Sequence, residues 1–161
     1  MKEVPLKSVA EIIMGTAPPS SSYNTDGIGI PMIAGAGDYG PKHPTPKKWT
    51  TAPTRIAEPG DLIICIRATI GDINWADKHY CLGRGVSGIR PKDERLDIQY
   101  LAHFILAKKQ ELTSLGTGST FLAIRRSDLE DFRIPLPPRD EQERIAAILD
   151  KADAIRRKRA K

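Results

Sequence analysis

Three prolines close to the C-terminal end constrain the fold more than any other feature of the sequence. Pro135, Pro137 and Pro138 stand in the run FRIPLPP. Proline has a fixed φ and no backbone N–H, so these positions disfavour both helix and the inside of a sheet. They predict an extended, stiff segment by which the chain leaves a globular region. Asp140 and Glu143 follow at capping-box spacing and predict that a helix begins with Asp140 as its N-cap.

The segment after the prolines, residues 139–161, has the pattern of an amphipathic helix. Its apolar side chains form a stripe like a coiled-coil seam, and its last turns, IRRKRAK, are nearly all cationic. One interpretation is an ordinary terminal helix that packs on its own domain. The proline run and the cationic end instead favour a protruding, coiled-coil-type helix that contacts a partner. The predicted partner face consists of Ile145, Ile148, Leu149, Ala152 and Ile155.

The distribution of charge removes the simplest argument for nucleic-acid binding. The net charge is +5, and residues 151–161 hold six cations against one anion, Asp153. Subtracting these from the 25 Lys and Arg and the 20 Asp and Glu of the chain leaves 19 of each in residues 1–150. A local excess remains in residues 41–56, PKHPTPKKWTTAPTRI, which contain no acid. The basic pI alone therefore does not make the globular part a DNA binder.

Composition and cysteine content exclude several classes of protein. Hydrophobic residues make up 40% and charged residues 28% of the 161-residue chain, which is typical of one soluble domain. The apolar runs are too short for a membrane span, and the first residues do not resemble a secretory signal. Cys65 and Cys81 are too few for a disulfide framework. We therefore expect a cytoplasmic protein that has no membrane partner.

The internal pattern predicts an α+β fold, a single globular domain with a mixed, twisted β-sheet and short helices. Apolar spacing over residues 6–13, closed by Gly15, predicts a short N-terminal helix. Strand-length apolar runs occupy residues 30–34, 62–66, 70–75 and 86–90. Asp97 is the predicted N-cap of a second helix. The apolar face of that helix would consist of Ile98, Leu101, Ala102, Ile105, Leu106 and Leu112.

Several stretches of the sequence resemble one known family. The string IPLPPRDEQERIAAILDKADAIRRKR is similar to the junction at which a target-recognition domain of a type I restriction-modification specificity subunit (HsdS) enters its conserved spacer helix. The Glu141–Gln142 pair and the Ile148-Leu149-Asp150 step belong to that similarity. Three upstream segments match in the expected order: LKSVAEIIMGTAP, EPGDLIICIRATIGDINW and GTGSTFLAIRRSDLEDFRIPLPP. The resemblance covers nearly the whole chain.

The resemblance implies that residues 1–138 are a target-recognition domain and residues 139–161 the start of the spacer helix. Proteins of this family do not catalyse; each recognition domain reads one part of a split double-stranded DNA target. Spacer helices set the distance between two such domains and dock methyltransferase (M) subunits, which use S-adenosylmethionine to methylate adenine. A separate restriction/translocase (R) subunit uses ATP and magnesium. The expectation for this chain is a non-catalytic subunit that holds no cofactor and no metal itself.

The sequence departs from the family pattern because it contains one recognition domain, whereas a complete specificity subunit has two. A natural half subunit, a truncated gene product and an expression fragment all remain open. Two copies of a half subunit would pair through their 140–161 helices as a homodimer, with a palindromic target. A recognition domain from another chain is the alternative partner of the helix.

The residues predicted to contact DNA lie in loops or at strand ends and carry donors suited to phosphates and base edges. Arg67 directly follows the apolar run LIICI and should emerge at a strand end, and Arg84 stands between two glycines. The flexible backbone around Arg84 suits a close approach to phosphate. The predicted set is Lys42, His43, Lys47, Lys48, Arg67, Thr69, Arg84, Ser119, Thr120, Arg125 and Arg126.

Each of these predictions has a structural alternative. The lysines of residues 41–56 could be solvated loop residues, and Arg84 could belong to a plain turn. Arg67 could pair with Asp72, and the acids within residues 128–131 could neutralise Arg125 and Arg126. The GTGST loop offers N–H groups and hydroxyls to a phosphate but lacks the lysine and the spacing of a nucleotide-binding P-loop.

Enzymatic functions find little support in the sequence. Cys65, His79 and Cys81 do not have the spacing of a zinc site, and Cys65 within LIICI is typical of a core residue. Nucleophile-elbow, S-adenosylmethionine-binding and methylase catalytic motifs are not found. The remaining alternative to DNA recognition is an assembly adaptor that acts through its C-terminal helix and does not bind DNA.

Overall fold

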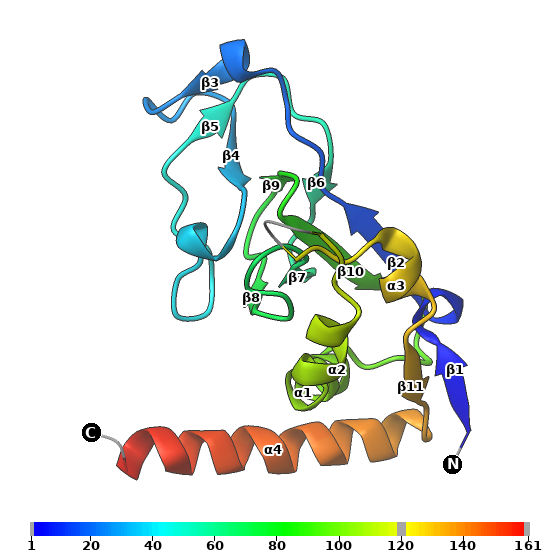
Figure 1. Cartoon of the computed structure of the whole chain (residues 1–161). Helices are drawn as coiled ribbons and strands as arrows, with labels where there is room; N and C mark the ends of the chain where they lie inside the picture. The colour runs from blue at the N-terminus through cyan, green and yellow to red at the C-terminus, as the bar shows by residue number, and fades with distance from the viewer. Residues whose placement is uncertain (1, 119–121, 160–161) are drawn as a thin grey trace.

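The central feature of the fold is a four-stranded antiparallel sheet in the order β2-β10-β7-β8. The structure is a computed structural model, which describes residues 2–118 and 122–159. The sheet contains β2 (Ala10–Met14), β10 (Val86–Pro91), β7 (Leu62–Cys65) and β8 (Ile73–Trp75), as Figure 1 shows. The predicted strands at 30–34, 62–66 and 86–90 are present with shifted ends, and the predicted strand at 70–75 is reduced to Ile73–Trp75.

A second sheet makes the fold mixed. Its order is β3-β5-β4-β9-β6, and its β4–β9 pair is parallel whereas its other pairs are antiparallel. A third, two-stranded sheet pairs the start of the chain, β1 (Glu3–Pro5), with β11 (Arg133–Pro135). The strands of the second sheet are β3 (Tyr23–Asn24), β4 (Ile30–Ile33), β5 (Trp49–Thr50), β6 (Ile56–Ala57) and β9 (Tyr80–Leu82).

Helices lie on one side of the central sheet and at the end of the chain. Helix α1 (Ile98–Ala107) is followed by α2 (Lys109–Ser114), α3 (Arg126–Glu130) and the long α4 (Arg139–Arg159). Three short 3-10 helices join the strands: η1 (Leu6–Ser8), η2 (Ser20–Ser22) and η3 (Ala36–Asp38). This arrangement confirms the predicted α+β class. None of the helices in the described residues is long and apolar enough to cross a membrane.

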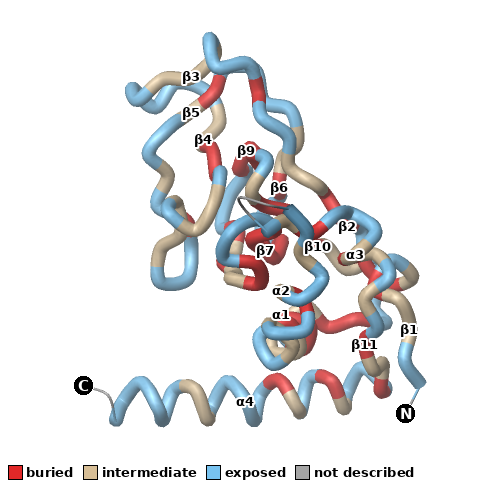
Figure 2. Tube along the Cα trace, in the orientation of Figure 1, coloured by how far each residue is buried: buried red, intermediate tan, exposed pale blue. Residues whose placement is uncertain are grey.

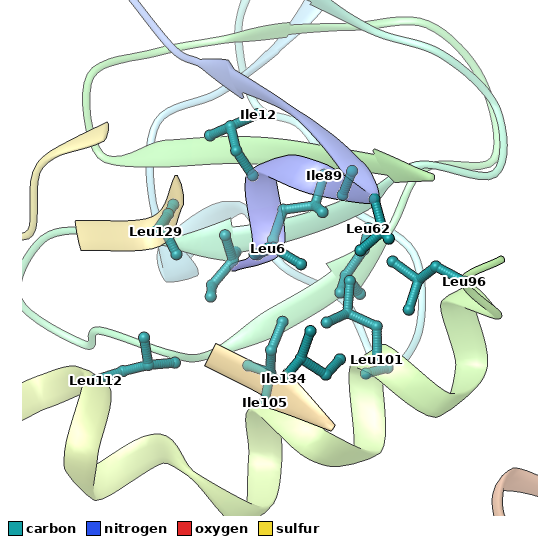
Figure 3. Close-up of a cluster of buried hydrophobic side chains, with 14 of the residues drawn as sticks. Leu6, Ile12, Leu62, Ile89, Leu96, Leu101, Ile105, Leu112, Leu129 and Ile134 are labelled. Atoms are coloured by element: carbon teal, nitrogen blue, oxygen red, sulfur yellow. The ribbon is translucent and has the colours of Figure 1, made fainter. Parts of the chain in front are cut away.

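The central sheet is buried on both faces, and its strands divide their side chains between two hydrophobic clusters. Leu62 and Ile64 of β7 join a cluster that includes Leu101 and Ile105 of α1. Figure 3 shows Leu62 beside these residues of α1. Ile63 of the same strand faces the opposite way, into a cluster with residues of the second sheet. Successive side chains of a strand point to opposite faces, so a continuous apolar run fits a strand that is covered on both sides.

The predicted N-terminal helix over residues 6–13 is wrong. The chain forms η1 over Leu6–Ser8 and then the strand β2, in which Ile12 pairs with Ile89 and Ile13 with Gly88 of β10. Ile12 and Ile13 are both buried, one in each hydrophobic cluster. Adjacent residues reach opposite clusters only in a strand, so tertiary packing overrides a short helical spacing that β-branched residues support weakly.

The helix predicted after Asp97 is confirmed, with one correction to its apolar face. The carboxylate of Asp97 accepts a hydrogen bond from the backbone N–H of Tyr100 at 2.9 Å, as an N-cap does. The helix ends at Ala107, so Leu112 reaches the core from a separate helix, α2. Leu106 was placed on the buried face but is exposed.

Helix α4 begins two residues earlier than predicted, with its first residue at Arg139, and is not capped by Asp140. The carbonyl of Pro138 accepts a hydrogen bond from the N–H of Gln142, which places Pro138 at the cap position. Glu143 pairs with Arg139 at 2.9 Å instead of closing a capping box. The stiff proline exit itself is present, although Pro135 still lies within β11, paired with Glu3.

Candidate nucleic-acid interface

The ends of three strands form a groove of about 530 Å³. Strands β4 and β9 run parallel, so the segments that follow them, 34–37 and 83–85, lie side by side. The turn after β7 joins them because the N–H of Ile66 donates to the carbonyl of Gly85 at 2.9 Å. We call this the arginine groove. Its lining residues are Ala17, Tyr23, Met32, Ala34, Gly35, Ala36, Gly37, Arg67, Ala68, Thr69, Gly83, Arg84 and Gly85.

Two arginines of the groove keep their charge free for a ligand. Arg67 and Arg84 are exposed, and neither forms an ion pair with a carboxylate among residues 2–118 and 122–159. The alternative that Arg67 pairs with Asp72 is not what the structure contains, because Asp72 pairs with Lys109. An unpaired guanidinium presents its fork of donors to a phosphate or to the O6 and N7 of guanine.

The glycines around Arg84 serve the packing of the strands. A Cβ built on Gly85 would lie 2.1 Å from the carbonyl oxygen of Ala34, so this position requires glycine for close strand contact. That differs from the expectation that these glycines give Arg84 a flexible backbone. Gly35 and Gly37 behave differently, since a Cβ on either would meet no atom within 4 Å. Their part of the groove is bare backbone that is open to a ligand.

The turn that carries Arg67 and Thr69 has an unusual backbone that neighbouring residues hold in place. Ala68, between them, has φ 59°, which lies in the left-handed region that residues with a Cβ rarely adopt. Its N–H donates to the carbonyl of Leu122 at 3.0 Å, and the N–H of Ile124 donates to the carbonyl of Ile66 at 2.9 Å. Residues 122–124 thus fix the direction in which the turn presents its side chains.

Two lysines of the acid-free stretch adjoin the groove. The ammonium of Lys47 donates to the carbonyl of Gly37 at 2.7 Å. The ammonium of Lys48 lies 5.9 Å from the centre of the Tyr23 ring, in a cation–π contact. Gly37 and Tyr23 both line the groove. The predicted residues Lys47, Lys48, Arg67, Thr69 and Arg84 are therefore brought together.

Lys42 and His43 lie elsewhere. The carbonyl of Lys42 accepts from the N–H of Trp75, and a ring nitrogen of His43 lies 3.0 Å from the carbonyl oxygen of Trp75. Lys42 also lines a separate cavity with residues of α1 and α4, among them His103. The chain bends at residues 41–43 and again at Lys47, so neighbouring cations of the stretch 41–56 reach different surfaces.

The remaining predicted DNA contacts divide into paired residues and residues that the structure does not describe. Arg125 lies 3.6 Å from the carboxylate of Asp128, and Arg126 lies 3.9 Å from that of Glu130. The neutralising alternative is thus confirmed for these two acids, both on α3. Ser119 and Thr120 lie outside the described residues.

Sequence reasoning missed Tyr23, Met32 and the glycines at 35 and 37 as groove residues. Tyr23 and Met32 lie in strands of the second sheet and have no neighbouring charge that would mark them. The spacing Gly35-Ala36-Gly37 was a usable signal for an open backbone. Cys65 lies behind the groove, where burial raises the pKa of its thiol and so disfavours the thiolate that a metal ligand requires.

The predicted partner face on α4 is largely open. Ile148, Leu149 and Ile155 are exposed, and Ile148 has 62% of its surface accessible. Ile145 and Ala152 are partly buried. The opposite expectation, packing on the chain's own domain, is also met in part, because Ala146 belongs to the cluster beneath α1. Figure 2 shows the buried positions of α4 in its first half. The helix thus touches its own domain along one side and presents apolar residues along another.

Comparison with known proteins decides the family. The model of the type I restriction modification DNA specificity domain matches residues 1–161. The chain belongs to this family. A putative type I restriction enzyme MjaX specificity subunit from Methanocaldococcus jannaschii is 40% identical over 145 residues, which cover 90% of this chain and 34% of that protein. The MjaIX specificity subunit of the same organism is 27% identical and covers 93% of this chain and 37% of its own length.

Solved structures agree with the fold of this specificity domain. The HsdS subunit from Thermoanaerobacter tengcongensis has a TM-score of 0.86 and 41% identity, over 95% of this chain and 37% of that one. A chain from work on complex assembly and conformational transition of the type I R-M system has a TM-score of 0.88 and 42% identity. The match covers 99% of this chain and 40% of that one. The S subunit from M. genitalium, at 19% identity and a TM-score of 0.72, supports the fold alone. The chain spans about a third of the length of the curated relatives it matches.

Proposed function

We propose that this specificity domain is the DNA-reading part of a type I restriction-modification complex and that it reads one part of a bipartite target through the arginine groove. One observation carries the proposal. Arg67 and Arg84, which form no ion pair within the described part of the chain, and the adjoining Lys47 and Lys48 gather at one groove of a domain whose residues 1–150 are neutral overall. A surface of this kind attracts a polyanion without depending on net charge.

The side chains at the groove suit two kinds of contact. Lys47 and Lys48 act as point charges toward phosphates, which gives affinity without sequence information. Arg67, on its fixed turn, offers a bidentate fork to guanine, and the neighbouring Thr69 offers a hydroxyl to a base edge. Arg84 lies on the neighbouring segment, which Ile66 binds through the carbonyl of Gly85, and offers a second guanidinium to the same strand of DNA. The bare backbone at Gly35 and Gly37 lets that strand approach closely.

The chain itself does no chemistry in this proposal. Adenine methylation with S-adenosylmethionine belongs to an M subunit, and ATP- and magnesium-dependent translocation belongs to an R subunit, all in the cytoplasm. The exposed apolar residues of α4 support docking of the M subunit or of a second spacer helix, from a copy of this chain or from another recognition domain. Two copies would read a palindromic target.

DNA recognition is tested with the assembled complex of this chain and its methyltransferase partner. Binding to a panel of duplexes is measured by fluorescence anisotropy at several salt concentrations. We expect one sequence to be preferred by roughly 1,000-fold or more over others, with affinity falling steeply as salt rises. Equal binding to all duplexes contradicts the proposal and favours the assembly adaptor that does not read DNA.

The docking role of α4 is tested by charge on its exposed face. The double substitution Ile148→Asp and Leu149→Asp should abolish methyltransferase docking or self-association, because two carboxylates cannot be buried in an apolar seam. The free chain should remain folded, since both side chains are exposed. Docking is measured by size-exclusion chromatography with light scattering, with Arg144→Ala on the same helix as the control. Unchanged assembly contradicts the docking role, and unfolding favours a helix that only completes its own domain.

A further inference from the structure

The start of α4 is joined to the domain by Arg139, which is partly exposed and donates to the carbonyl of Glu94 at 2.9 Å, and by one buried amide. Gln142 is 0% exposed, and its side chain makes three hydrogen bonds of 2.8 Å. Its Oε1 accepts from the N–H of Asp97, the N-cap of α1, and its Nε2 donates to the carbonyls of Arg95 and Pro137. A single side chain thus links the first turn of α4, the proline exit and the start of α1. Each of these bonds has a fixed direction.

Helix α4 is also held further along its length, by a histidine of α1. The Nε2 of His103 on α1 lies 2.6 Å from Oδ1 of Asp150 on α4, and its Nδ1 lies 4.0 Å from Oδ2 of Asp153. Gln142 and Asp150 are eight residues apart, about 12 Å along the helix axis. Ala146 lies between them and is buried against α1. Its methyl contact lets the helices come close but is non-directional, so it does not fix their angle.

We propose that Gln142 and His103 are positioning residues that together set the direction in which α4 leaves the recognition domain. Directional contacts at two places about 12 Å apart fix a line, whereas contacts at the helix start alone leave a pivot about which the helix can tilt. At 21 residues α4 is about 31 Å long, so a tilt of about 10° at its start moves its far end by about 5 Å. That exceeds the ~3.4 Å between neighbouring base pairs of a DNA strand. If the domain reads DNA as proposed, this mount sets the separation of the two halves of the target.

The proposal is tested on the free chain by measuring the distance between two spin labels. The labels are attached through Lys78→Cys on the domain and Lys158→Cys near the end of α4, both at exposed positions, while Cys65 and Cys81 are buried and stay unlabelled. The parent should give one narrow distance distribution. Gln142→Ala and His103→Ala should each shift or broaden it by about 5 Å, the displacement that a ~10° tilt produces.

Two controls separate positioning from stability. Arg144→Ala, at an exposed position of the same helix, should leave the distribution unchanged. Ile64→Val, in the core, should lower the unfolding midpoint without changing the distribution of the folded molecules. An unchanged distribution in either Gln142→Ala or His103→Ala overturns the proposal. Should Gln142→Ala fail to fold, His103→Ala decides alone. The measurement needs no DNA, so its failure would leave the proposed function untouched.

Discussion

The arginine groove and the junction of α1 with α4 use cationic side chains in opposite ways. At the junction, Arg139 donates to the carboxylate of Glu143 and to the carbonyl of Glu94, both at 2.9 Å, and lies 3.4 Å from the carboxylate of Asp97. At the groove, Arg67 and Arg84 form no ion pair with any of the described residues. The same residue type is therefore structural at one end of the molecule and available to a ligand at the other.

The difference follows from what surrounds each cation. Helix starts gather acids, as at Asp97 and Glu143, because a carboxylate is stabilised by the free N–H groups there, and these acids neutralise a neighbouring arginine. The groove is built from the ends of three strands, and its lining of glycines and mostly small side chains contains no carboxylate. A cation placed there keeps its hydrogen-bonding capacity for an external anion. The two surfaces therefore differ in whether their arginines form ion pairs, and not in whether they contain arginine.

The largest expected effect is on DNA binding by the double substitution Arg67→Ala and Arg84→Ala. Loss of about 2 kcal/mol per arginine contact weakens binding of the preferred duplex by roughly 1,000-fold. The unfolding midpoint should not change, because both side chains are exposed and unpaired among the described residues. Anisotropy with the assembled complex and thermal unfolding of the free chain measure the two quantities. If the double variant binds the duplex with full affinity, DNA binds elsewhere, and the groove arginines differ from the junction arginine only in pairing and not in function.

A stability effect of the next size is expected where an arginine is paired. The side chain of Asp61 is 3% exposed and accepts two hydrogen bonds from Arg90, at 2.8 and 2.7 Å, and one from the N–H of Glu58. Asp61→Ala removes the buried acceptor of these bonds and leaves Arg90 only the longer ion pairs with Glu11 and Glu58, both at 3.7 Å, so it should lower the free energy of unfolding by about 3 kcal/mol. Urea denaturation measures this free energy of unfolding. We expect a smaller decrease in Asp61→Asn, because the amide oxygen still accepts a hydrogen bond. DNA affinity of the folded variant should remain; its loss would show that the paired cation also reads DNA.

The smallest expected effect concerns a single lysine. Lys48→Ala removes one phosphate contact, so the slope of log affinity against log salt should fall by about 1, with a weakening of only a few-fold across all duplexes. Arg126→Ala is the matched control, since that arginine is already paired with Glu130 at 3.9 Å. Salt titrations of the two variants are compared with the parent. Equal slopes for the parent, Lys48→Ala and Arg126→Ala would mean that Lys48 does not contact a phosphate, although it lies next to the groove.

Much of the local structure was predictable because it depends on neighbours in sequence. Asp97 caps α1 as expected, the runs before Arg67 and after Gly85 form strands, and Asp128 neutralises Arg125 three residues away. The helix expected over residues 6–13 failed because Ile12 and Ile13 belong to two different clusters, one on each face of the sheet. No local pattern shows that a sheet will be covered on both sides.

The candidate site was predictable only in pieces. Arg67, Thr69 and Arg84 were marked by strand ends and glycines, but their meeting with Lys47 and Lys48 depends on the parallel β4–β9 pair and on the bond from Ile66 to Gly85. Lys42 and His43, neighbours of those lysines in sequence, turn away to Trp75. Gln142 was visible as half of the Glu-Gln pair in the family-like motif, but its burial and its three partners were not.

The sequence by itself determined the α+β class, the proline exit, the amphipathic character of the last helix and the family resemblance. These depend on periodicity, on the backbone limits of proline and on short motifs, which act within a few residues. The tertiary structure decided which cations stay unpaired and how α4 is directed. Both depend on groups that are far apart in sequence, such as Gln142 with Asp97 and Arg67 with Arg84, and only the packed chain brings such groups within reach of one another. The helix that dominates the end of the sequence is thus held by Arg139 and the buried amide of Gln142 at its start, and by His103 of α1 further along.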